Sequence, residues 1–286
     1  MVEQHSIPRV ESLPIDGGRM EVWHLPGGPG VPLLVLGGVE LGLRPMGGTE
    51  HVLFRRWERR AKRRSVIALG RPIPDDRADA GLLMHPRVIA DAVASVLGRL
   101  APEVEGPFAI EAESGGGRIS LWLTVEHPEL VSRMVLASVA SETQPDSPMA
   151  GRLGRWAELA ESQEWGRLFG GLAQEMKPGT DARVGSFDAA ARLQPRPSTP
   201  ERFIAELRTT LEPSSFVTSR LGEIRVPTLI LAGGQDQVVE PERTRQVALA
   251  IPGARFEMDP DSGHTVRSSF ADYDDLVEAF LAEGDP

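Results

Sequence analysis

The chain has 286 residues, of which 41% are hydrophobic and 25% are charged, and its formal net charge is -10. This composition is ordinary for a globular protein with a full core. The excess of acidic residues argues against nucleic acid and against an anionic membrane surface as partners. The sequence contains no cysteine, which excludes disulfides, thiolate catalysis and cysteine-bound zinc.

The N-terminal segment, residues 1–18, is polar and of mixed charge. It lacks the basic region and the apolar region of a secretory signal. Apolar runs elsewhere are too short to cross a bilayer. These features predict a cytoplasmic protein that is not bound to a membrane.

The first elements are extended. Segments 9–13 and 20–24 flank Asp16-Gly17-Gly18, and Asp-Gly between extended segments predicts a hairpin. Gly27 to Gly30 predicts a turn. The continuous apolar run 31–36 that follows is typical of a strand buried on both faces.

The next part of the chain alternates helices with buried strands. Thr49 is the expected N-cap of a helix that ends at about Arg63. After it, strands are expected at 65–69, 108–110 and 134–137, and helices at 85–100 and 118–126. Repeated strand–helix units predict a parallel sheet with helices on both faces.

This alternation stops between residues 142 and 222, where no buried strand is visible. The segment has helical patterns at 153–159, 165–176 and 201–211. Strands return at 226–232 and 255–258, and a last helix is expected at about 267–282. We therefore predict an α/β core from residues 1–141 and 223–286, with residues 142–222 as a helical lid, or cap domain, over the strand ends.

Ser114 stands where the strand at 108–110 turns into a helix, in Ala112-Glu113-Ser114-Gly115-Gly116-Gly117. Such a bend exposes the hydroxyl at the carboxyl edge of the sheet, beside the first amide of the helix. The pattern is G-x-S-x-G with Ala112 in place of the first glycine. The alternative is that Ser114 only caps the helix.

Two other polar residues follow strands. Asp236 lies in Gly233-Gly234-Gln235-Asp236, and His264 ends Ser262-Gly263-His264. Parallel strands end on one side of a sheet, so Ser114, Asp236 and His264 are expected at one edge. A hydroxyl, an imidazole and a carboxylate are what acyl transfer needs.

With these segments, the strand–helix order of nearly the whole chain resembles the α/β-hydrolase superfamily. The resemblance implies a mostly parallel eight-stranded sheet, with the cap inserted after the sixth strand. It also implies that Ser114 is the nucleophile, His264 the general base and Asp236 the acid that orients it. The oxyanion hole would use the amide of Gly115 and one from the loop Leu36-Gly37-Gly38-Val39-Glu40, from Gly38 or from Val39.

Several assignments keep an alternative. Glu142, after the strand at 134–137, is a second candidate for the acid. Trp156, Trp165 and Phe169 either line a substrate pocket or form the core of the cap. Glu111 is expected to be solvated.

The predicted function is hydrolysis of a small-molecule carboxylic ester through an acyl-enzyme on Ser114. No metal-binding spacing appears, so a reaction without metal or cofactor is expected. The same triad also serves lactone, thioester, amide and C–C bond hydrolysis and acyl transfer, and the fold does not choose among them. A binding protein with a silent triad is the alternative of another class.

Overall fold

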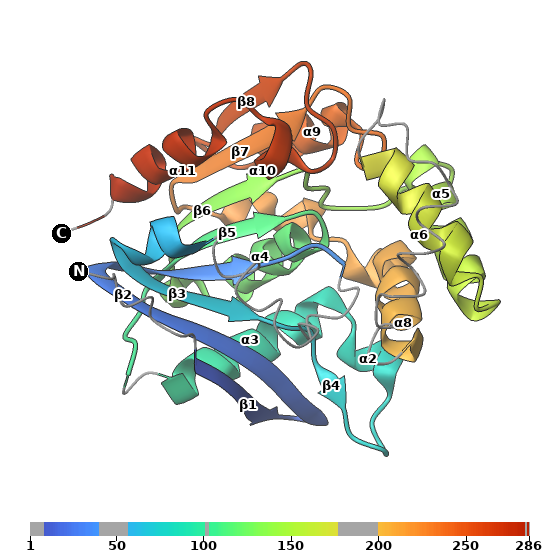
Figure 1. Cartoon of the computed structure of the whole chain (residues 1–286), viewed down its shortest axis with the longest axis horizontal. Coiled ribbons are helices and arrows are strands. Elements are labelled where there is room, and N and C mark those ends of the chain that lie inside the picture. Colours follow the sequence, from blue (N-terminus) through green and yellow to red (C-terminus); the bar gives the residue numbers. More distant parts are fainter. Residues whose placement is uncertain (1–8, 40–56, 101–102, 177–199, 284, 286) are drawn as a thin grey trace, which may run out of the picture.

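The computed structural model describes residues 9–39, 57–100, 103–176, 200–283 and 285. They contain one eight-stranded sheet with helices on both faces (Figure 1). Its strands are β1 (Arg9–Ile15), β2 (Gly18–Leu36), β3 (Arg64–Leu69), β4 (Ile73–Pro74), β5 (Phe108–Glu113), β6 (Val131–Ala137), β7 (Thr228–Gly233) and β8 (Arg255–Asp259). Strand order is β1-β2-β5-β6-β7-β8, with β3 and β4 also paired to β2. From β2 through β8 along that order the pairing is parallel, which confirms the predicted fold class.

Helices are present at the predicted positions that the structure describes. A short helix covers residues 57–61, before β3. The others are α2 (Ala80–Leu83), α3 (Pro86–Leu100), α4 (Gly115–Glu126), α5 (Pro148–Glu161), α6 (Trp165–Met176), α8 (Pro200–Leu211), α9 (Pro241–Ala250), α10 (Val266–Ser269) and α11 (Tyr273–Ala282), with 3₁₀ turns η1 (Pro128–Leu130), η2 (Pro213–Ser215) and η3 (Thr218–Glu223). Of these helices, α2 and α9 are additional to those predicted. Thr49, the predicted N-cap residue of the helix before β3, lies outside the described residues.

The prediction of one continuous last helix is wrong. The segment is divided into α10 and α11 because Phe270 is extended and Asp272 adopts a left-handed conformation with φ 57°. Neither conformation continues a right-handed helix. The helix therefore restarts at Tyr273 in a new direction.

The long strand β2 doubles back around β3. Val22 pairs with Leu69, and Leu36 pairs with the same residue, so β3 lies between the two halves of β2. The register shifts between the halves include Pro29 and Gly30, where the sequence predicts a turn. A Cβ on Gly27 would lie 2.2 Å from the Arg64 carbonyl oxygen, so the close approach requires glycine there. The expected hairpin of β1 and β2 is present, with Ile15 paired to Gly18.

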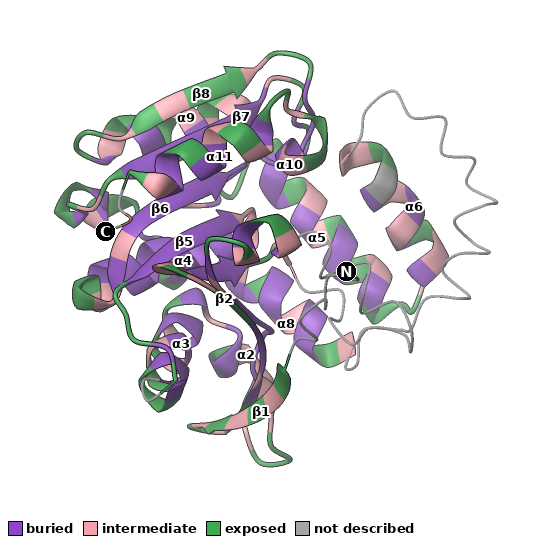
Figure 2. Ribbon diagram, turned by 60° about the vertical axis from the view of Figure 1, so that its left-hand side comes forward, coloured by how far each residue is buried: buried purple, intermediate pink, exposed green. Residues whose placement is uncertain are grey.

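Each central strand is buried on both faces of the sheet, as Figure 2 shows for β5, β6 and β7. Alternate residues point to opposite faces. Leu34 and Leu36 join a cluster with α3, α4 and α9, whereas Leu33 and Val35 join one with Trp57 and α11. The continuous apolar runs in the sequence reflect this double burial.

Helices α5, α6 and α8 lie together beyond the strand ends (Figures 1 and 2). Their apolar faces form a separate cluster that includes Leu153, Leu168 and Phe203, and that also contains Val238 and Val239 from the loop after β7. All three helices fall between β6 and β7 in the chain. The division into a core and a cap over residues 142–222 stays a prediction.

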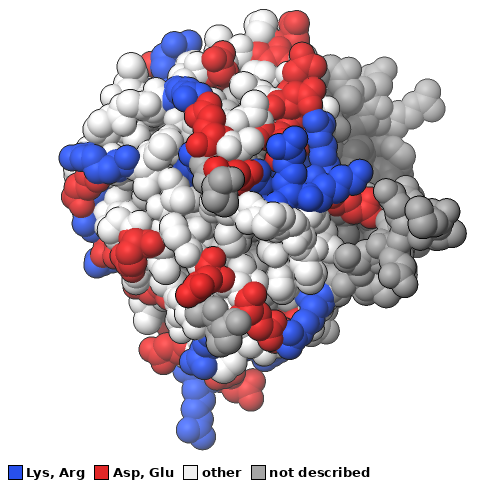
Figure 3. All heavy atoms as spheres, turned by 90° about the vertical axis from the view of Figure 1, so that its left-hand side faces the viewer, with Lys and Arg blue, Asp and Glu red and all other residues white. Residues whose placement is uncertain are grey.

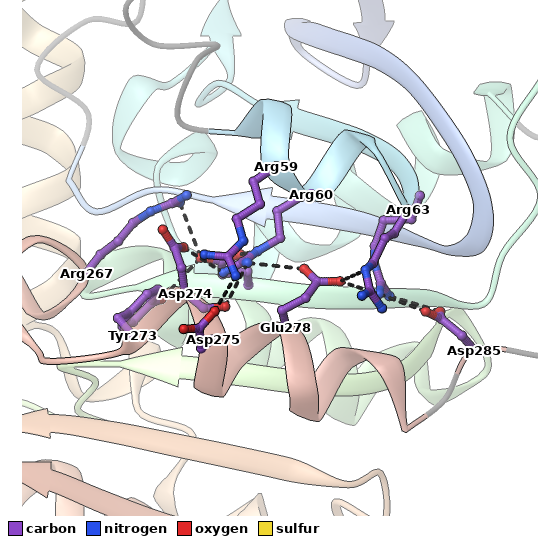
Figure 4. Close-up of polar contacts among 11 residues, drawn as sticks. Arg59, Arg60, Arg63, Arg267, Tyr273, Asp274, Asp275, Glu278 and Asp285 are labelled. Atoms are coloured by element: carbon purple, nitrogen blue, oxygen red, sulfur yellow. Dashed lines mark hydrogen bonds and ion pairs between the residues drawn. The ribbon is translucent and has the colours of Figure 1, made fainter.

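Charged side chains are buried between the helix at 57–61, strand β5 and helix α11 (Figure 4). The fully buried Arg60 bonds to Glu111 on β5 at 3.1 Å and to Glu278 on α11 at 3.2 Å. Arg64 bonds to Glu278 at 3.1 Å and to Asp285 at 2.9 Å. This network attaches the C-terminal helix to the sheet through ion pairs as well as apolar packing.

The expectation that Glu111 is solvated is wrong. Glu111 is 3% exposed, and it lies 3.3 Å from Arg267 and accepts a hydrogen bond from Tyr273 at 3.2 Å. Burial opposes its ionisation most strongly, but Arg267 and Arg60 together outweigh burial and lower its pKa. Its ionised form therefore stabilises the fold. This contribution is complete above the ordinary pKa of 4.5 and is lost as the pH falls through the lowered value.

At the surface, the same region presents basic and acidic side chains side by side (Figure 3). Arg59 pairs with Asp275, and both are more than half exposed. Such exposed pairs contribute little to stability because water and salt screen them. Among the helices of the described residues, none combines the length and the apolarity needed to span a bilayer.

We predict that Glu111→Gln destabilises the fold far more than Asp275→Asn, although each replaces one ion-paired carboxylate by an amide. Loss of a buried partner costs about 3–5 kcal/mol, and we expect the lower end because Arg60 keeps Glu278. The exposed pair should cost less than about 1 kcal/mol. Urea unfolding at pH 7 measures both, and equal losses would contradict the assignment of Glu111 as a structural anchor.

Candidate active site

Ser114 occupies the bend between β5 and α4. Its φ is 54° and its ψ is -122°, a conformation that non-glycine residues avoid. The residue donates its amide to the Ala137 carbonyl at 2.9 Å, which extends the pairing of β5 with β6 to the bend itself. Strain of this kind costs about 1–3 kcal/mol and persists only where the surroundings impose it.

Small residues around the bend allow the close approach of neighbouring backbones. A Cβ on Gly116 would lie 2.2 Å from the carbonyl oxygens of Leu36 and Gly37, and one on Gly117 would lie 2.7 Å from Val139. Ala112, in place of the first glycine of the pattern, is buried and pairs with both β2 and β6. A methyl group fits at position 112, whereas position 116 requires glycine.

The structure brings Ser114, His264 and Asp236 into contact. His264 Nε2 lies 3.1 Å from Ser114 Oγ, and His264 Nδ1 lies 3.0 and 2.9 Å from the two Asp236 carboxylate oxygens. They follow three strands, β5, β7 and β8, at one edge of the sheet. The imidazole thus bridges a hydroxyl and a buried carboxylate, the arrangement that activates a serine nucleophile.

Asp236 is held in place by backbone amides. Its Oδ1 accepts from Val238 N at 2.8 Å and from Val239 N at 2.9 Å, so the carboxylate is oriented before it meets the imidazole. Glu142, the second candidate for the acid, accepts instead from the Gln144 side chain. The acid that contacts His264 is Asp236.

The surroundings raise the pKa of His264. Burial acts against the charged imidazole, but the hydrogen bond and charge of Asp236, together with the charge of Glu113, outweigh it. Its pKa therefore lies above the ordinary value of 6.5. A histidine with this environment accepts a proton readily and stabilises the resulting imidazolium.

Backbone amides for an oxyanion lie beside Ser114. A Cβ built on Gly38 would lie 3.5 Å from Ser114 Cβ, and the Val39 amide nitrogen lies 3.5 Å from the Cβ position of Gly115. Neither the Gly38 nor the Val39 amide donates to an acceptor within the described part of the chain. Both remain candidates for the second donor, alongside Gly115.

Arg71 fixes the loop that carries these amides. Its Nη2 donates to the Gly38 carbonyl at 2.8 Å and to the Gly37 carbonyl at 3.1 Å, and its Nε pairs with Glu206 of α8 at 2.7 Å. Because a peptide carbonyl and the next amide turn together, a guanidinium on the carbonyls of residues 37 and 38 also orients the amides of 38 and 39. Sequence reasoning missed Arg71. Its position two residues after the buried strand β3 was the available signal.

A cavity of about 210 Å³ lies between Ser114 and the helices α5, α6 and α8. Its described walls are mainly apolar and include Met149, Leu153, Trp156 and Phe203. Of the three aromatic residues proposed for the pocket, Trp156 lines this cavity. Trp165 and Phe169 are not among the lining residues and stack on each other at 6.2 Å between ring centroids.

Two charged residues of the cavity wall escaped sequence reasoning, Arg118 and Glu206. Arg118 follows the glycines of the bend directly, one helical turn after Ser114, and that position was a usable signal. Glu206 lies on a helix far away in the chain, and no local pattern distinguishes it from a solvated residue. Among the residues that the structure describes, no cluster of three or more histidine or carboxylate side chains could hold a metal ion.

The sheet is mostly parallel, and at its edge the serine of the bend contacts a histidine that contacts a carboxylate. These features define an α/β-hydrolase. The family model described as serine aminopeptidase, S33, matches residues 87–266, and the chain belongs to that family. It is a serine hydrolase of the α/β fold.

Curated relatives agree with this class. The chain is 25% identical over 206 residues to a pimeloyl-[acyl-carrier protein] methyl ester esterase of Neisseria meningitidis, covering 66% of this chain and 76% of the relative. It is 28% identical over 183 residues to the 2-hydroxymuconate semialdehyde hydrolase of Pseudomonas putida, covering 62% and 63%. A thermophilic esterase from Thermogutta terrifontis shares the fold with a TM-score of 0.70 at 18% identity, covering 98% of this chain and all of the other.

The environment of His264 predicts the pH dependence of hydrolysis. Only the neutral imidazole can accept the serine proton, so kcat/KM should fall as the pH drops through a pKa above 6.5. Glu113→Gln removes a charge that raises this pKa, and should shift the acid limb to lower pH. The profile is measured with a neutral ester. Glu142→Gln, an equal change of charge elsewhere, is the control, and an unmoved limb in Glu113→Gln would contradict the assignment.

Proposed function

We propose that this hydrolase cleaves small-molecule carboxylic esters through an acyl-enzyme on Ser114. The observation that carries the proposal is the double contact of His264, with Ser114 Oγ at 3.1 Å on one side and Asp236 at 2.9 Å on the other. Together with the mainly apolar cavity beside the hydroxyl, it provides a nucleophile, a base and a place for the acyl group.

In the proposed reaction, Ser114 Oγ attacks the ester carbonyl carbon while His264 Nε2 takes the hydroxyl proton. The tetrahedral oxyanion accepts hydrogen bonds from the Gly115 amide and from that of Gly38 or Val39. His264 then gives the proton to the departing alkoxide. The alcohol is released, and the acyl group stays bound to Ser114 as an acyl-enzyme. A water molecule, deprotonated by His264, attacks this acyl group, and the acid is released.

Each step uses side chains and amides of this chain, so the proposed mechanism needs no metal. The relatives support ester cleavage, since one is named as a methyl ester esterase and another as an esterase. A cavity of about 210 Å³ is below the about 300–1,000 Å³ of typical sites for drug-sized ligands, which favours a small acyl group. The similar proteins also include an enol-lactonase and a semialdehyde hydrolase, which is why other hydrolytic reactions on the same triad remain alternatives to ester cleavage.

We predict that Ser114→Ala lowers kcat on a p-nitrophenyl ester about 10⁴- to 10⁶-fold, because the covalent route is lost. His264→Ala should do similar damage, and Asp236→Asn somewhat less. Glu142→Gln is the matched control for the acid and should retain wild-type turnover.

A fluorophosphonate probe supplies the second measurement. It should label the wild-type protein at Ser114 and leave Ser114→Ala unlabelled, as mass spectrometry of the peptides would show. Folded protein that is not labelled would support a binding protein with a silent triad. Retention of most activity in Ser114→Ala would mean that another residue is the nucleophile.

Arg71 should affect catalysis through the loop that it holds. We predict that Arg71→Met lowers kcat about 10- to 100-fold with little change in KM, somewhat less than the about 10²- to 10³-fold loss of one oxyanion donor. Glu206→Gln leaves both carbonyl contacts in place and should have a smaller effect. Steady-state kinetics measure kcat and KM separately, and urea unfolding controls for a loss of stability. A rise in KM with unchanged kcat would contradict a positioning role.

A further inference from the structure

Arg118 is a buried cation in the wall of the active-site cavity. The residue is 3% exposed and stands on α4, one turn after Ser114. Ser114 and Arg118 both line the cavity that lies under α5, α6 and α8. Arg118 therefore borders the same cavity that the acyl group of a Ser114 ester would enter.

All acceptors of the Arg118 guanidinium are uncharged. Its Nε donates to the Ala140 carbonyl at 3.1 Å. Its Nη1 donates to the Thr210 carbonyl at 2.8 Å and to Ser215 Oγ at 3.3 Å, and its Nη2 donates to Thr143 Oγ1 at 2.9 Å. Four of its five N–H groups are thus occupied, and the fifth, on Nη2, has no acceptor in the described part of the chain.

No carboxylate of the described residues lies within ion-pair distance of Arg118. Burial lowers the pKa of Arg118 to about 10, and the charge of Glu142 opposes this only partly. The side chain is still protonated at neutral pH, so a positive charge is held out of water without an anion beside it. Burying such a charge is costly unless an anion accompanies it.

The second arginine at this site shows the contrast. Arg71 is also buried and also meets helix α8, but it pairs with the Glu206 carboxylate at 2.7 Å. This pairing also neutralises Glu206, one of the two acids in the described cavity wall. The other acid, Glu113, directly precedes the nucleophile Ser114 in the chain. The described residues of the cavity wall therefore supply no anion to Arg118.

We propose that Arg118 binds a carboxylate carried by the substrate, at the end of the acyl group remote from the ester. The preferred substrates are then half-esters of short dicarboxylic acids, held by the nucleophile at one end and the guanidinium at the other. This inference rests on the proposed esterase function. A guanidinium with a free N–H and an uncompensated charge suits a carboxylate better than a neutral oxygen, because only the carboxylate also supplies the counter-charge that a buried cation lacks.

The test compares two methyl esters of the same shape. Monomethyl glutarate carries a terminal carboxylate, and methyl 5-methylhexanoate carries an isopropyl group in its place. At pH 7.5 the wild-type enzyme should favour the half-ester in kcat/KM by roughly 10- to 100-fold, from a lower KM. Monomethyl succinate and adipate locate the best chain length. A wild-type preference for the neutral ester at every length would overturn the proposal without any variant.

Arg118→Met should abolish the preference, so that the ratio of kcat/KM for the half-ester to kcat/KM for the neutral ester falls to about one or below within the same variant. Arg118→Lys should restore part of the preference, since it keeps the charge without the planar fork. Arg208→Met, on the exposed side of α8, is the matched control and should keep the wild-type ratio. Equal losses on both esters in Arg118→Met and Arg118→Lys would show that Arg118 serves only to attach the cap helices, and would overturn the proposal.

Failure of this inference and failure of the esterase proposal give different results. If wild-type protein hydrolyses the neutral ester and reacts with fluorophosphonate but shows no preference for half-esters, the carboxylate site is wrong and the esterase stands. If neither ester is cleaved and Ser114 is not labelled, the esterase itself is wrong.

Discussion

The bend at Ser114 is the constraint on which the site depends. A non-glycine residue keeps φ 54° only because β5 is paired on both sides up to the bend and because α4 begins at the next residue. Gly116 completes this arrangement, since its backbone packs against the carbonyls of Leu36 and Gly37. The same contact brings residues 37–39 beside the nucleophile. One backbone geometry therefore exposes the hydroxyl and places the candidate oxyanion amides next to it.

A second constraint connects the nucleophile strand to the histidine. Glu111 lies three residues before Ser114, and Arg267 lies three residues after His264, and these two side chains pair at 3.3 Å. Arg60 holds the other carboxylate oxygen of Glu111 at 3.1 Å. Buried ion pairs need specific partners at specific distances, whereas apolar packing accepts small displacements. This network therefore favours one register between β5 and the segment that carries the base.

The sequence was sufficient for the fold class and for the meeting of Ser114, Asp236 and His264. Continuous apolar runs identify doubly buried strands, and parallel strands must end at one edge, so residues directly after such strands converge whatever the details of packing. The last helix was predicted less well, because a local change at Asp272 divides it while the apolar periodicity continues.

Residues whose environment depends on distant partners could not be predicted. Glu111 resembles any glutamate in a strand until Arg60 and Arg267, remote in sequence, are placed around it. Trp165 and Phe169 belong to an apolar helical face, and periodicity shows that this face is covered but not by what. The two rings stack on each other, and neither is among the residues that line the cavity.

Helix α8 joins the two ends of the site. It provides Glu206 to Arg71, which holds the candidate oxyanion loop, and the Thr210 carbonyl to Arg118, which faces the cavity. If both arginines served only to attach the helix, a carboxylate of the protein could pair with each of them. The structure neutralises Arg71 and leaves Arg118 with uncharged acceptors. This asymmetry distinguishes an arginine that completes the protein's own architecture from one whose charge is left for a ligand.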